Sequence, residues 1–233
     1  MYTLLYSCYN VPDEVIEWHL QNWKAYPQSL RDQWSFLLID DGSKNPLDPP
    51  VDFPLNLTIA RIMEDKGWNS GGAKNLGFKL AARNWVLQSD IDHSLSPDDA
   101  QRIIDLVKDK RLIYQFARYY NNGKGNIELG RPHINTFLIH RDTFWELGGY
   151  DEDFSGHYGY EDVLFVERGR NRFVMCNHIA VTTRLDWHTA GCDRSLERNK
   201  ALLDLKMSDI NKGSYRNNEV LRFRWQVIRE YRG

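Results

Sequence analysis

Aspartate residues follow two apolar segments of the sequence in a pattern that suits metal and nucleotide chemistry. Asp90-Ile91-Asp92 comes directly after segment 85–89, and Asp40-Asp41-Gly42-Ser43 follows segment 34–39. Two carboxylates at the end of a buried strand can hold an oxygen-preferring cation such as Mg²⁺ or Mn²⁺ against substrate phosphates. Each motif alone is also typical of an ordinary turn, in which Asp side chains cap nearby N–H groups. Two acid-ended strands in one sheet favour the functional interpretation.

A second pair of carboxylates, Glu161 and Asp162, stands at the start of a segment that we predict to be helical. Acidic side chains in a first helical turn stabilise the helix dipole, and this alone would account for the pair. The same dipole would keep Asp162 ionised and able to accept a proton, whereas burial near Tyr158 and Tyr160 would oppose ionisation.

Two common phosphate-binding patterns are missing from the sequence. It contains neither a Walker A lysine loop nor a G-x-G-x-x-G motif after its first apolar segment. The sequence therefore supports neither a P-loop phosphotransferase nor a dinucleotide-dependent dehydrogenase.

The elements that must position these acids alternate between strand and helix in the first half of the chain. We predict strands at 2–10, 34–39, 55–59 and 85–89, and helices that begin near residues 12, 71 and 97. This alternation predicts an α/β fold with a mostly parallel central sheet and helices on both faces. Ligands of such sheets bind beyond the carboxyl ends of the strands, where Asp40, Asp41, Asp90 and Asp92 fall.

The second half is less regular and is predicted to extend the same sheet. We expect strands at 112–120 and 135–140, and helices near 160–168, 195–206 and 219–231. No Gly-, Ser- or Pro-rich linker marks a boundary, so we expect one domain over residues 1–233. The predicted C-terminal helix is basic and amphipathic. It could contact an anionic membrane, but packing of its apolar side on the domain is favoured.

Composition narrows the function classes further. The chain has 233 residues, of which 42% are hydrophobic and 27% charged, with a formal net charge of -2. This charge disfavours a general nucleic-acid binder. No apolar run approaches the roughly 18 residues that span a bilayer. The three cysteines form no C-x-x-C pair, which argues against a disulfide framework or a sulfur-based zinc site and suits a cytoplasmic location.

Several of these motifs together resemble the GT-A fold (Rossmann-like) nucleotide-sugar glycosyltransferases, especially the family 2 type. The resemblance covers most of the chain and rests on segment 6–10, the Asp40-Asp41-Gly42-Ser43 motif, the helix start at 71–77 and Asp90-Ile91-Asp92. It implies that residues 1–110 form the nucleotide-sugar-binding half. The implied nucleotide-binding residues are Ser7, Tyr9, Asp40, Asp41, Lys74, Asn75 and Asp90.

The second half is similar to the galactosyltransferase branch of these enzymes. The similarity rests on an apolar strand at 137–140, the turn Gly148-Gly149-Tyr150 and the motif Gly159-Tyr160-Glu161-Asp162. It implies that residues 111–233 form the acceptor-binding half, with Asp162 as catalytic base. Implied acceptor-binding residues are Glu161, Tyr160 and Tyr158, and implied metal ligands are Asp92, Asp90 and His188. A lone histidine is more often a surface or core polar residue, so the assignment of His188 depends on the resemblance.

We therefore predict a metal-dependent, inverting glycosyltransferase that uses Mn²⁺ or Mg²⁺. The expected partners are a nucleotide-sugar donor, with a UDP-sugar favoured, and a glycan or glycoconjugate acceptor. Departure of a diphosphate is helped by a bound cation, and attack by a weakly acidic alcohol needs a base. The acids above can supply both the cation site and the base. The alternatives are a retaining transferase of the same fold, a sugar-phosphate nucleotidyltransferase, and an inactive nucleotide- or glycan-binding module.

Overall fold

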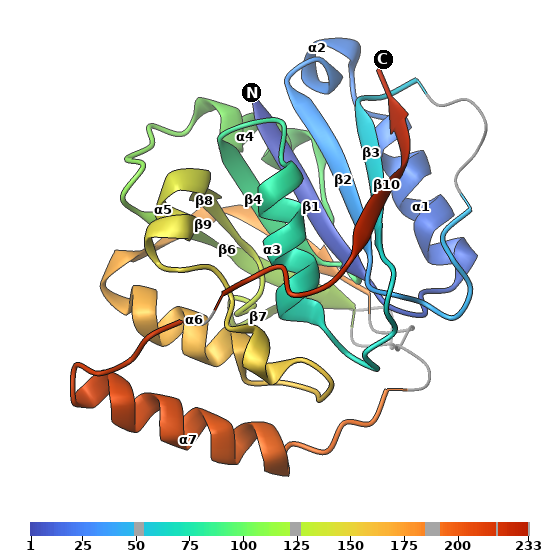
Figure 1. The fold of residues 1–233 in the computed structure, drawn as a ribbon. Coiled ribbons are helices and arrows are strands. Elements are labelled where there is room, and N and C mark those ends of the chain that lie inside the picture. Colours follow the sequence, from blue (N-terminus) through green and yellow to red (C-terminus); the bar gives the residue numbers. More distant parts are fainter. Residues whose placement is uncertain (49–53, 122–126, 185–191, 218, 233) are drawn as a thin grey trace.

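The apolar segments that alternate with helical patterns in the sequence form the strands of one sheet. A computed structural model describes residues 1–48, 54–121, 127–184, 192–217 and 219–232. Its strands are β1 (Tyr2–Cys8), β2 (Trp34–Asp40), β3 (Leu57–Ile62), β4 (Trp85–Asp90), β5 (His93–Leu95), β6 (Ile113–Asn121), β7 (Ile127–Gly130), β8 (Phe137–His140), β9 (Phe173–Thr183) and β10 (Trp225–Tyr231). They are arranged in the order β10-β3-β2-β1-β4-β8-β6-β9-β5, and β7 pairs with β6 (Figure 1).

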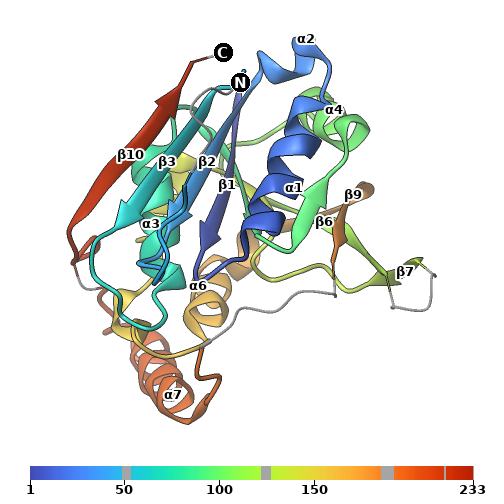
Figure 2. The ribbon, with the colours of Figure 1, turned by 90° about the vertical axis from the view of Figure 1, so that its right-hand side faces the viewer.

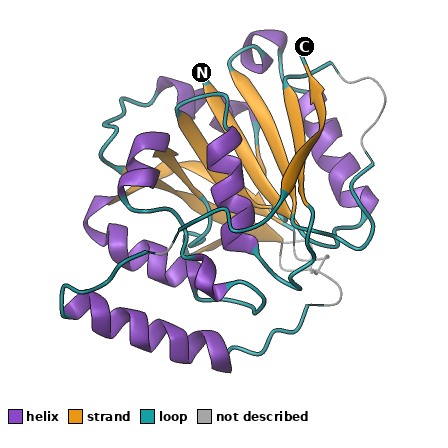
Figure 3. Cartoon of the chain, in the orientation of Figure 1, coloured by secondary structure: helices purple, strands orange, loops and turns teal. Residues whose placement is uncertain are grey.

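Helices cover both faces of this sheet (Figure 3). They are α1 (Asp13–Lys24), α2 (Gln28–Arg31), α3 (Ser70–Leu80), α4 (Pro97–Asp105), α5 (Arg141–Glu146), α6 (Glu161–Gly169) and α7 (Glu197–Asn211), with short 3₁₀ turns η1 (Glu152–Phe154) and η2 (Arg170–Arg172). In β1, Leu4 and Tyr6 pack in the core under α1 and α4, whereas Leu5 packs in the core under α3, α5 and α6. Period-two alternation along buried strands thus divides the apolar side chains between two cores. The predicted α/β fold is confirmed.

Parallel and antiparallel pairings both occur in the sheet, and β6 pairs with β9 in parallel. Strands β3, β2, β1 and β4 run parallel, but β8 is antiparallel to both β4 and β6. The prediction of a mostly parallel sheet is therefore corrected to a mixed one. Strands β6, β7 and β8 follow one another without an intervening helix, and a parallel pairing of sequential strands needs such a crossover.

The predicted helix at 219–231 is wrong, because Trp225–Tyr231 is strand β10. It pairs antiparallel with β3 and closes one edge of the sheet (Figure 2). The backbone N–H and C=O groups of β3 would otherwise be unpaired on that side, and their pairing outweighs the helical spacing of the C-terminal apolar residues. The amphipathic helix on which the membrane contact was based therefore does not exist. No helix in the described part of the chain is long and apolar enough to cross a bilayer.

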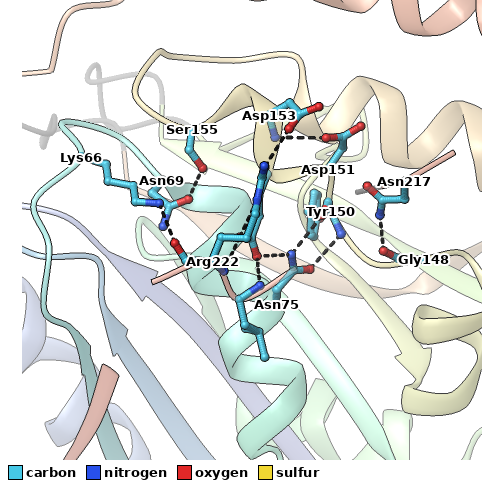
Figure 4. Close-up of polar contacts among 12 residues, drawn as sticks. Lys66, Asn69, Asn75, Gly148, Tyr150, Asp151, Asp153, Ser155, Asn217 and Arg222 are labelled. Atoms are coloured by element: carbon cyan, nitrogen blue, oxygen red, sulfur yellow. Dashed lines mark hydrogen bonds and ion pairs between the residues drawn. The ribbon is translucent and has the colours of Figure 1, made fainter. Parts of the chain in front are cut away.

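The acidic turn η1 holds the C-terminal segment against the fold (Figure 4). The carboxylate of the buried Glu152 accepts hydrogen bonds from Nδ2 of Asn75 at 2.9 Å, from N of Leu221 at 2.7 Å and from N of Arg222 at 3.0 Å. Nζ of Lys206, on α7, lies 2.7 Å from Asp151. Through these contacts, the segment that precedes α6 is connected to α3, to α7 and to the residues just before β10.

Candidate active site

A cleft of about 410 Å³ opens at the carboxyl ends of β1 and β4 and at the first turn of α6. Ligands of open α/β sheets bind at this edge, because the loops that follow parallel strands converge there. The cleft brings together most of the predicted site residues, namely Ser7, Tyr9, Asp41, Asp90, Asp92, Tyr158, Tyr160, Glu161 and Asp162. It also includes residues that sequence reasoning did not assign, among them His133, Asn135, Arg194 and Leu196.

Three predicted nucleotide-binding residues do not line this cleft: Lys74, which is described below, and Asp40 and Asn75. The fully buried Asp40 forms an ion pair with Arg61, and its Oδ1 accepts a hydrogen bond from N of Ser43 at 2.8 Å. Asn75 donates to O of Tyr150 at 3.0 Å and accepts from its N at 2.8 Å. The side chains of Asp40 and Asn75 therefore hold main-chain segments that border the cleft. His188 lies outside the described residues.

Lys74 supplies a buried positive charge behind the cleft. Its Nζ lies 3.7 Å from Oδ1 of Asp90 and 5.3 Å from the ring centre of Tyr150, with no hydrogen-bond partner among the described residues. Burial raises the pKa of Asp90, but the charges of Lys74 and His133 outweigh burial and lower that pKa below its usual value. Lys74 therefore keeps the first carboxylate of the Asp-x-Asp motif ionised.

One side of the cleft presents Asp41 beside a row of aromatic rings. Oδ2 of Asp41 accepts a hydrogen bond from N of Asn69 at 2.8 Å, while its buried Oδ1 has no partner among the described residues. Burial raises the pKa of Asp41 well above its usual value. The ring centres of Tyr9 and Trp68 are 6.1 Å apart, and those of Trp68 and Tyr158 are 5.0 Å apart. This wall offers an unsatisfied oxygen and flat stacking surfaces to a planar ligand.

The guanidinium of Arg194 extends the aromatic wall with a positive charge. It lies 5.3 Å from the ring centre of Tyr158, and both side chains line the cleft. A guanidinium over a tyrosine ring is stabilised by the ring's negative face and keeps its donors available to anions. No sequence motif marked this residue, because it is one of several arginines in the C-terminal third.

The carboxylates of Glu161 and Asp162 sit in different environments. Asp162 accepts two hydrogen bonds, from Nδ2 of Asn135 at 3.0 Å and from N of Val163 at 2.7 Å. Glu161 is only 5% exposed, and its Oε2 has no partner among the described residues. Burial, together with the negative charge of Asp162, raises the pKa of Glu161 to about 7. Asp162 is thus held in place by its donors, while Glu161 can exchange a proton near neutral pH.

An unusual backbone conformation delivers these two carboxylates to the cleft. Gly159 and Tyr160 both have positive φ angles, of +85° and +72°, directly before α6 begins at Glu161. A tyrosine in the left-handed region is strained, and such strain is often found at functional sites. A Cβ at Gly71 would lie 3.1 Å from Cβ of Tyr150 and 3.4 Å from Cγ of Glu161. Glycine at that position lets α3 approach α6 closely.

Three buried side chains restrain the main chain around the Asp-x-Asp motif. Nε2 of His19 lies 2.6 Å from O of Ile91, the hydroxyl of Tyr6 donates to O of His93 at 2.9 Å, and the hydroxyl of Tyr26 donates to O of Leu95 at 2.7 Å. Burial lowers the pKa of His19 to about 4, so the ring is neutral and Nε2 donates its hydrogen to the carbonyl. Sequence reasoning missed His19, although the helical spacing of its neighbours Leu20 and Trp23 places it on the buried face of α1.

Two histidines, His93 and His133, adjoin the Asp-x-Asp carboxylates. Nδ1 of His93 lies 2.9 Å from Oδ1 of Asp92, and Nδ1 of His133 lies 3.4 Å from Oδ2 of Asp90. Potential ligand atoms of Asp90, His93 and His133 all lie within 4.8 Å of one another. Sequence reasoning assigned neither histidine. The only signal was the position of His93 directly after Asp92, since His133 reaches the site from a distant part of the chain.

The fold of the chain is similar to those of several solved glycosyltransferase structures. TarS 1–349 from S. aureus in complex with UDP-GlcNAc is 16% identical, with a TM-score of 0.65 over 88% of this chain and 64% of that chain. GalNAc-T7 with UDP, GalNAc and Mn²⁺ is 13% identical, with a TM-score of 0.67 over 92% and 49% of the two chains. The mannosyltransferase PcManGT from Pyrobaculum calidifontis in complex with GDP-Man and Mn²⁺ is 16% identical, with a TM-score of 0.55 over 78% and 56%.

These three comparisons show the fold, and the chain spans between 49% and 64% of the length of these proteins. Comparison with curated protein sequences gave no match. The sequence profile described as "Glycosyl transferase family 2" matches residues 9–174, which is more than half of the chain. The chain therefore belongs to glycosyl transferase family 2.

Proposed function

We propose that this protein transfers a sugar from a nucleotide-sugar donor to a hydroxyl group of a carbohydrate acceptor, with inversion at the anomeric carbon. One observation carries the proposal: Asp41, the Asp-x-Asp carboxylates and the Glu161–Asp162 pair line one cleft at the carboxyl ends of the parallel strands. The cleft therefore holds groups suited to a nucleotide base, a diphosphate and an acceptor hydroxyl.

The nucleotide is assigned to the side of the cleft that contains Asp41 and the aromatic wall. The unpartnered Oδ1 of Asp41 can accept a hydrogen bond from an imide N–H of the base, and Tyr9 and Trp68 offer stacking surfaces. A UDP-sugar is favoured because TarS and GalNAc-T7 were both solved with uridine nucleotides. Arg194 can pair with a phosphate of the donor.

The residues at the Asp-x-Asp motif fit a divalent cation. Candidate ligand atoms of Asp90, His93 and His133 lie within 4.8 Å of one another, and Oδ1 of Asp92 lies 2.9 Å from Nδ1 of His93. Carboxylates and imidazoles are hard and borderline donors, and Nε2 of the buried His93 has no hydrogen-bond partner among the described residues. When bound, such a cation neutralises negative charge on the leaving diphosphate. GalNAc-T7 and PcManGT were solved with Mn²⁺, which supports the choice of Mn²⁺.

Asp162 is assigned as the base that accepts the proton of the acceptor hydroxyl. The hydrogen bonds from Asn135 and from N of Val163 orient its carboxylate in the cleft. As the proton leaves, the hydroxyl oxygen attacks the anomeric carbon from the face opposite the diphosphate, so the configuration inverts. Glu161 and the side chains of Tyr158 and Tyr160, which line the same part of the cleft, are assigned to the acceptor.

The test is acceptor-dependent release of a nucleoside diphosphate. The protein is incubated with Mn²⁺, a panel of UDP-, GDP- and dTDP-sugars, and mono- and oligosaccharide acceptors, and the product is analysed by NMR. Turnover with inverted configuration is expected from one donor. Retained configuration would assign Glu161 and Asp162 to acceptor binding in a retaining enzyme. Nucleotide binding without turnover across the panel would favour an inactive binding module.

A further inference from the structure

Helix α7 lies beside α6 and contacts residues 154–160, which lead into the Glu161–Asp162 pair and are called the 154–160 loop below (Figure 1). The buried Asn199 stands in the first turn of α7. Its Nδ2 donates to O of Phe154 at 3.2 Å and to O of both His157 and Gly159 at 2.9 Å. One side chain from a later part of the chain therefore pairs with three carbonyl oxygens of this loop.

The 154–160 loop sets the position from which α6 begins. Gly159 and Tyr160 have positive φ angles, and Glu161 is the first residue of α6. A tyrosine in the left-handed region is strained, so this conformation persists only where the surrounding structure fixes it. The carbonyl of Gly159 belongs to the peptide group that joins Gly159 to Tyr160. Asn199 therefore holds the peptide group between the two left-handed residues.

Two side chains that precede α7 contact the same loop and also line the cleft. A Cβ at Gly159 would lie only 2.9 Å from Cδ2 of Leu196. The guanidinium of Arg194 lies 5.3 Å from the ring centre of Tyr158. Leu196 and Arg194 are both part of the cleft lining. The segment that leads into α7 therefore adjoins both the 154–160 loop and the cleft.

We propose that Asn199 is a positioning residue, which holds the 154–160 loop in the conformation that presents Asp162 to the acceptor hydroxyl. This inference rests on the proposed function, since it concerns the placement of the base in that reaction. An amide nitrogen carries two hydrogens and no charge, so it can pair with carbonyl oxygens without burying a charge. Misplacing a reacting group by about 1 Å can lower a rate about 10²-fold, so the precision of this loop matters for turnover.

The experiment compares two substitutions that keep the size of the side chain. Asn199→Leu removes both hydrogens of the amide, and Asn199→Asp places an acceptor oxygen against the carbonyl oxygens of the loop. In both variants kcat should fall by roughly 10–100-fold, because Asp162 is displaced from the acceptor. The KM for the donor should stay near that of the parent, because the nucleotide is assigned to the Asp41 side of the cleft.

Two control variants of α7 separate loop positioning from general stability. Nζ of Lys206 lies 2.7 Å from Asp151 and 2.6 Å from Asp153, so Lys206→Met removes these polar contacts of the same helix without removing a donor to the 154–160 loop. This variant should unfold at a lower urea concentration, because it leaves a buried carboxylate without its cation, and should keep a kcat near that of the parent. Asn211→Asp, at the exposed end of α7, should match the parent in both measurements.

A second measurement needs no donor. Burial raises the pKa of Glu161 to about 7 in the parent, and ¹³C NMR of its carboxyl group follows the titration. The spectrum of Glu161→Gln assigns the signal. When Asn199→Leu relaxes the loop, water should reach Glu161, and its pKa should fall toward the ordinary value.

Parental kcat and an unchanged pKa of Glu161 in an Asn199→Leu protein that is folded by circular dichroism would overturn the assignment. An equal loss of kcat in Lys206→Met would also overturn it, because any loosening of α7 would then have the same effect. Should Asn199→Leu fail to fold, the same criteria apply to Asn199→Asp. Absence of turnover in the parent would refute the proposed function alone, and the pKa of Glu161 would still decide whether Asn199 fixes the loop.

Discussion

The neighbouring carboxylates of Glu161 and Asp162 have different surroundings in the cleft. Asp162 is held by donors from Asn135 and Val163, whereas Glu161 is buried with one oxygen unpartnered. Burial raises the pKa of Glu161, and groups with a shifted pKa are common at catalytic sites. The division of roles between them can be tested by isosteric amide substitutions.

Replacing Asp162 with Asn keeps the size of the side chain but removes the proton acceptor. Turnover should fall by roughly 10²–10⁴, the usual range for a positioned acid or base. Donor affinity should stay near that of the parent, because the nucleotide is assigned to the Asp41 side of the cleft. Steady-state kinetics and calorimetry with UDP measure the two quantities. Near-parental turnover in the Asn variant would exclude Asp162 as the base.

Replacing Glu161 with Gln should change the pH dependence of stability. The folded protein keeps the Glu161 proton up to about pH 7, whereas the unfolded chain releases it near 4.5. The folded state therefore binds more protons between these values, and this group's contribution to stability falls as pH rises through them. Between pH 5 and pH 8 the parent should lose about 1–3 kcal/mol of unfolding free energy that the variant keeps.

Urea unfolding at the two pH values measures this difference. Glu17→Gln, at an exposed position of α1, is the matched control and should follow the parent. Parallel pH profiles for the parent and Glu161→Gln would show that the pKa of Glu161 is not raised in the folded protein.

Side chains of helix α1 and strand β1 restrain the backbone of the Asp-x-Asp turn. His19 and Tyr6 donate to the carbonyl oxygens of Ile91 and His93, so the turn that carries Asp92 is restrained without contact to its carboxylate. His19 also packs between the rings of Tyr6 and Trp18, at 4.6 and 4.7 Å between centres. Helix α1 therefore helps to position the Asp-x-Asp turn, although it does not line the cleft.

Replacing His19 with Phe keeps the ring packing but removes the hydrogen bond and the titration. The folded pKa of about 4 is below the ordinary 6.5, so only the unfolded state takes up a proton between these values. As pH decreases from 6.5 to 4, the free energy of unfolding of the parent should therefore fall by about 1–3 kcal/mol more than that of the variant. At pH 7.5 the variant should bind Mn²⁺ more weakly, because the turn is less restrained. A variant with the parent's acid sensitivity and Mn²⁺ affinity would argue against both roles.

The η1 turn joins elements that are distant in sequence, and Glu152 is its central group. Glu152→Ala would leave N–H groups of Asn75, Leu221 and Arg222 without their acceptor. Loss of a buried charged acceptor of this kind should cost about 2–4 kcal/mol. Urea denaturation measures the loss, and Glu14→Ala at an exposed site of α1 should be near neutral. A change below 1 kcal/mol in Glu152→Ala would mean that the C-terminal segment is held mainly by β10 pairing.

The whole molecule should respond to donor and cation together, because both are assigned to the same cleft. UDP and Mn²⁺ added together should raise the melting temperature more than the sum of their separate effects, since a ligand that binds only the folded state stabilises it by mass action. Asp92→Ala should reduce this coupling, because the carboxylate of Asp92 lines the cleft and is among the groups assigned to the cation. Thermal unfolding with each ligand and with both measures it. Full coupling in Asp92→Ala would mean that the cation is held elsewhere.

Local sequence patterns were sufficient to predict the longer strands and helices of the first half, although the short α2 and β5 were missed. Apolar runs such as Trp34–Asp40 are ended by acids and followed by turn residues, and this pattern is independent of the rest of the chain. The positions of Asp41, Asp90 and Asp92 at one edge followed from the parallel arrangement. The predicted family was confirmed over residues 9–174.

Other features depended on partners that are distant in sequence. Strand β10 forms because β3 presents an unpaired edge, so a segment with helical spacing becomes a strand. The side chains of Asp40 and Asn75 are of types that can bind a ligand. In the folded chain, however, Asp40 pairs with Arg61, and Asn75 is hydrogen-bonded to the backbone of Tyr150. The approach of His133 to His93 and Asp90 likewise depends on chain folding. Sequence spacing predicts local conformation and strand ends, whereas side-chain partners are set by packing between segments that no local pattern relates.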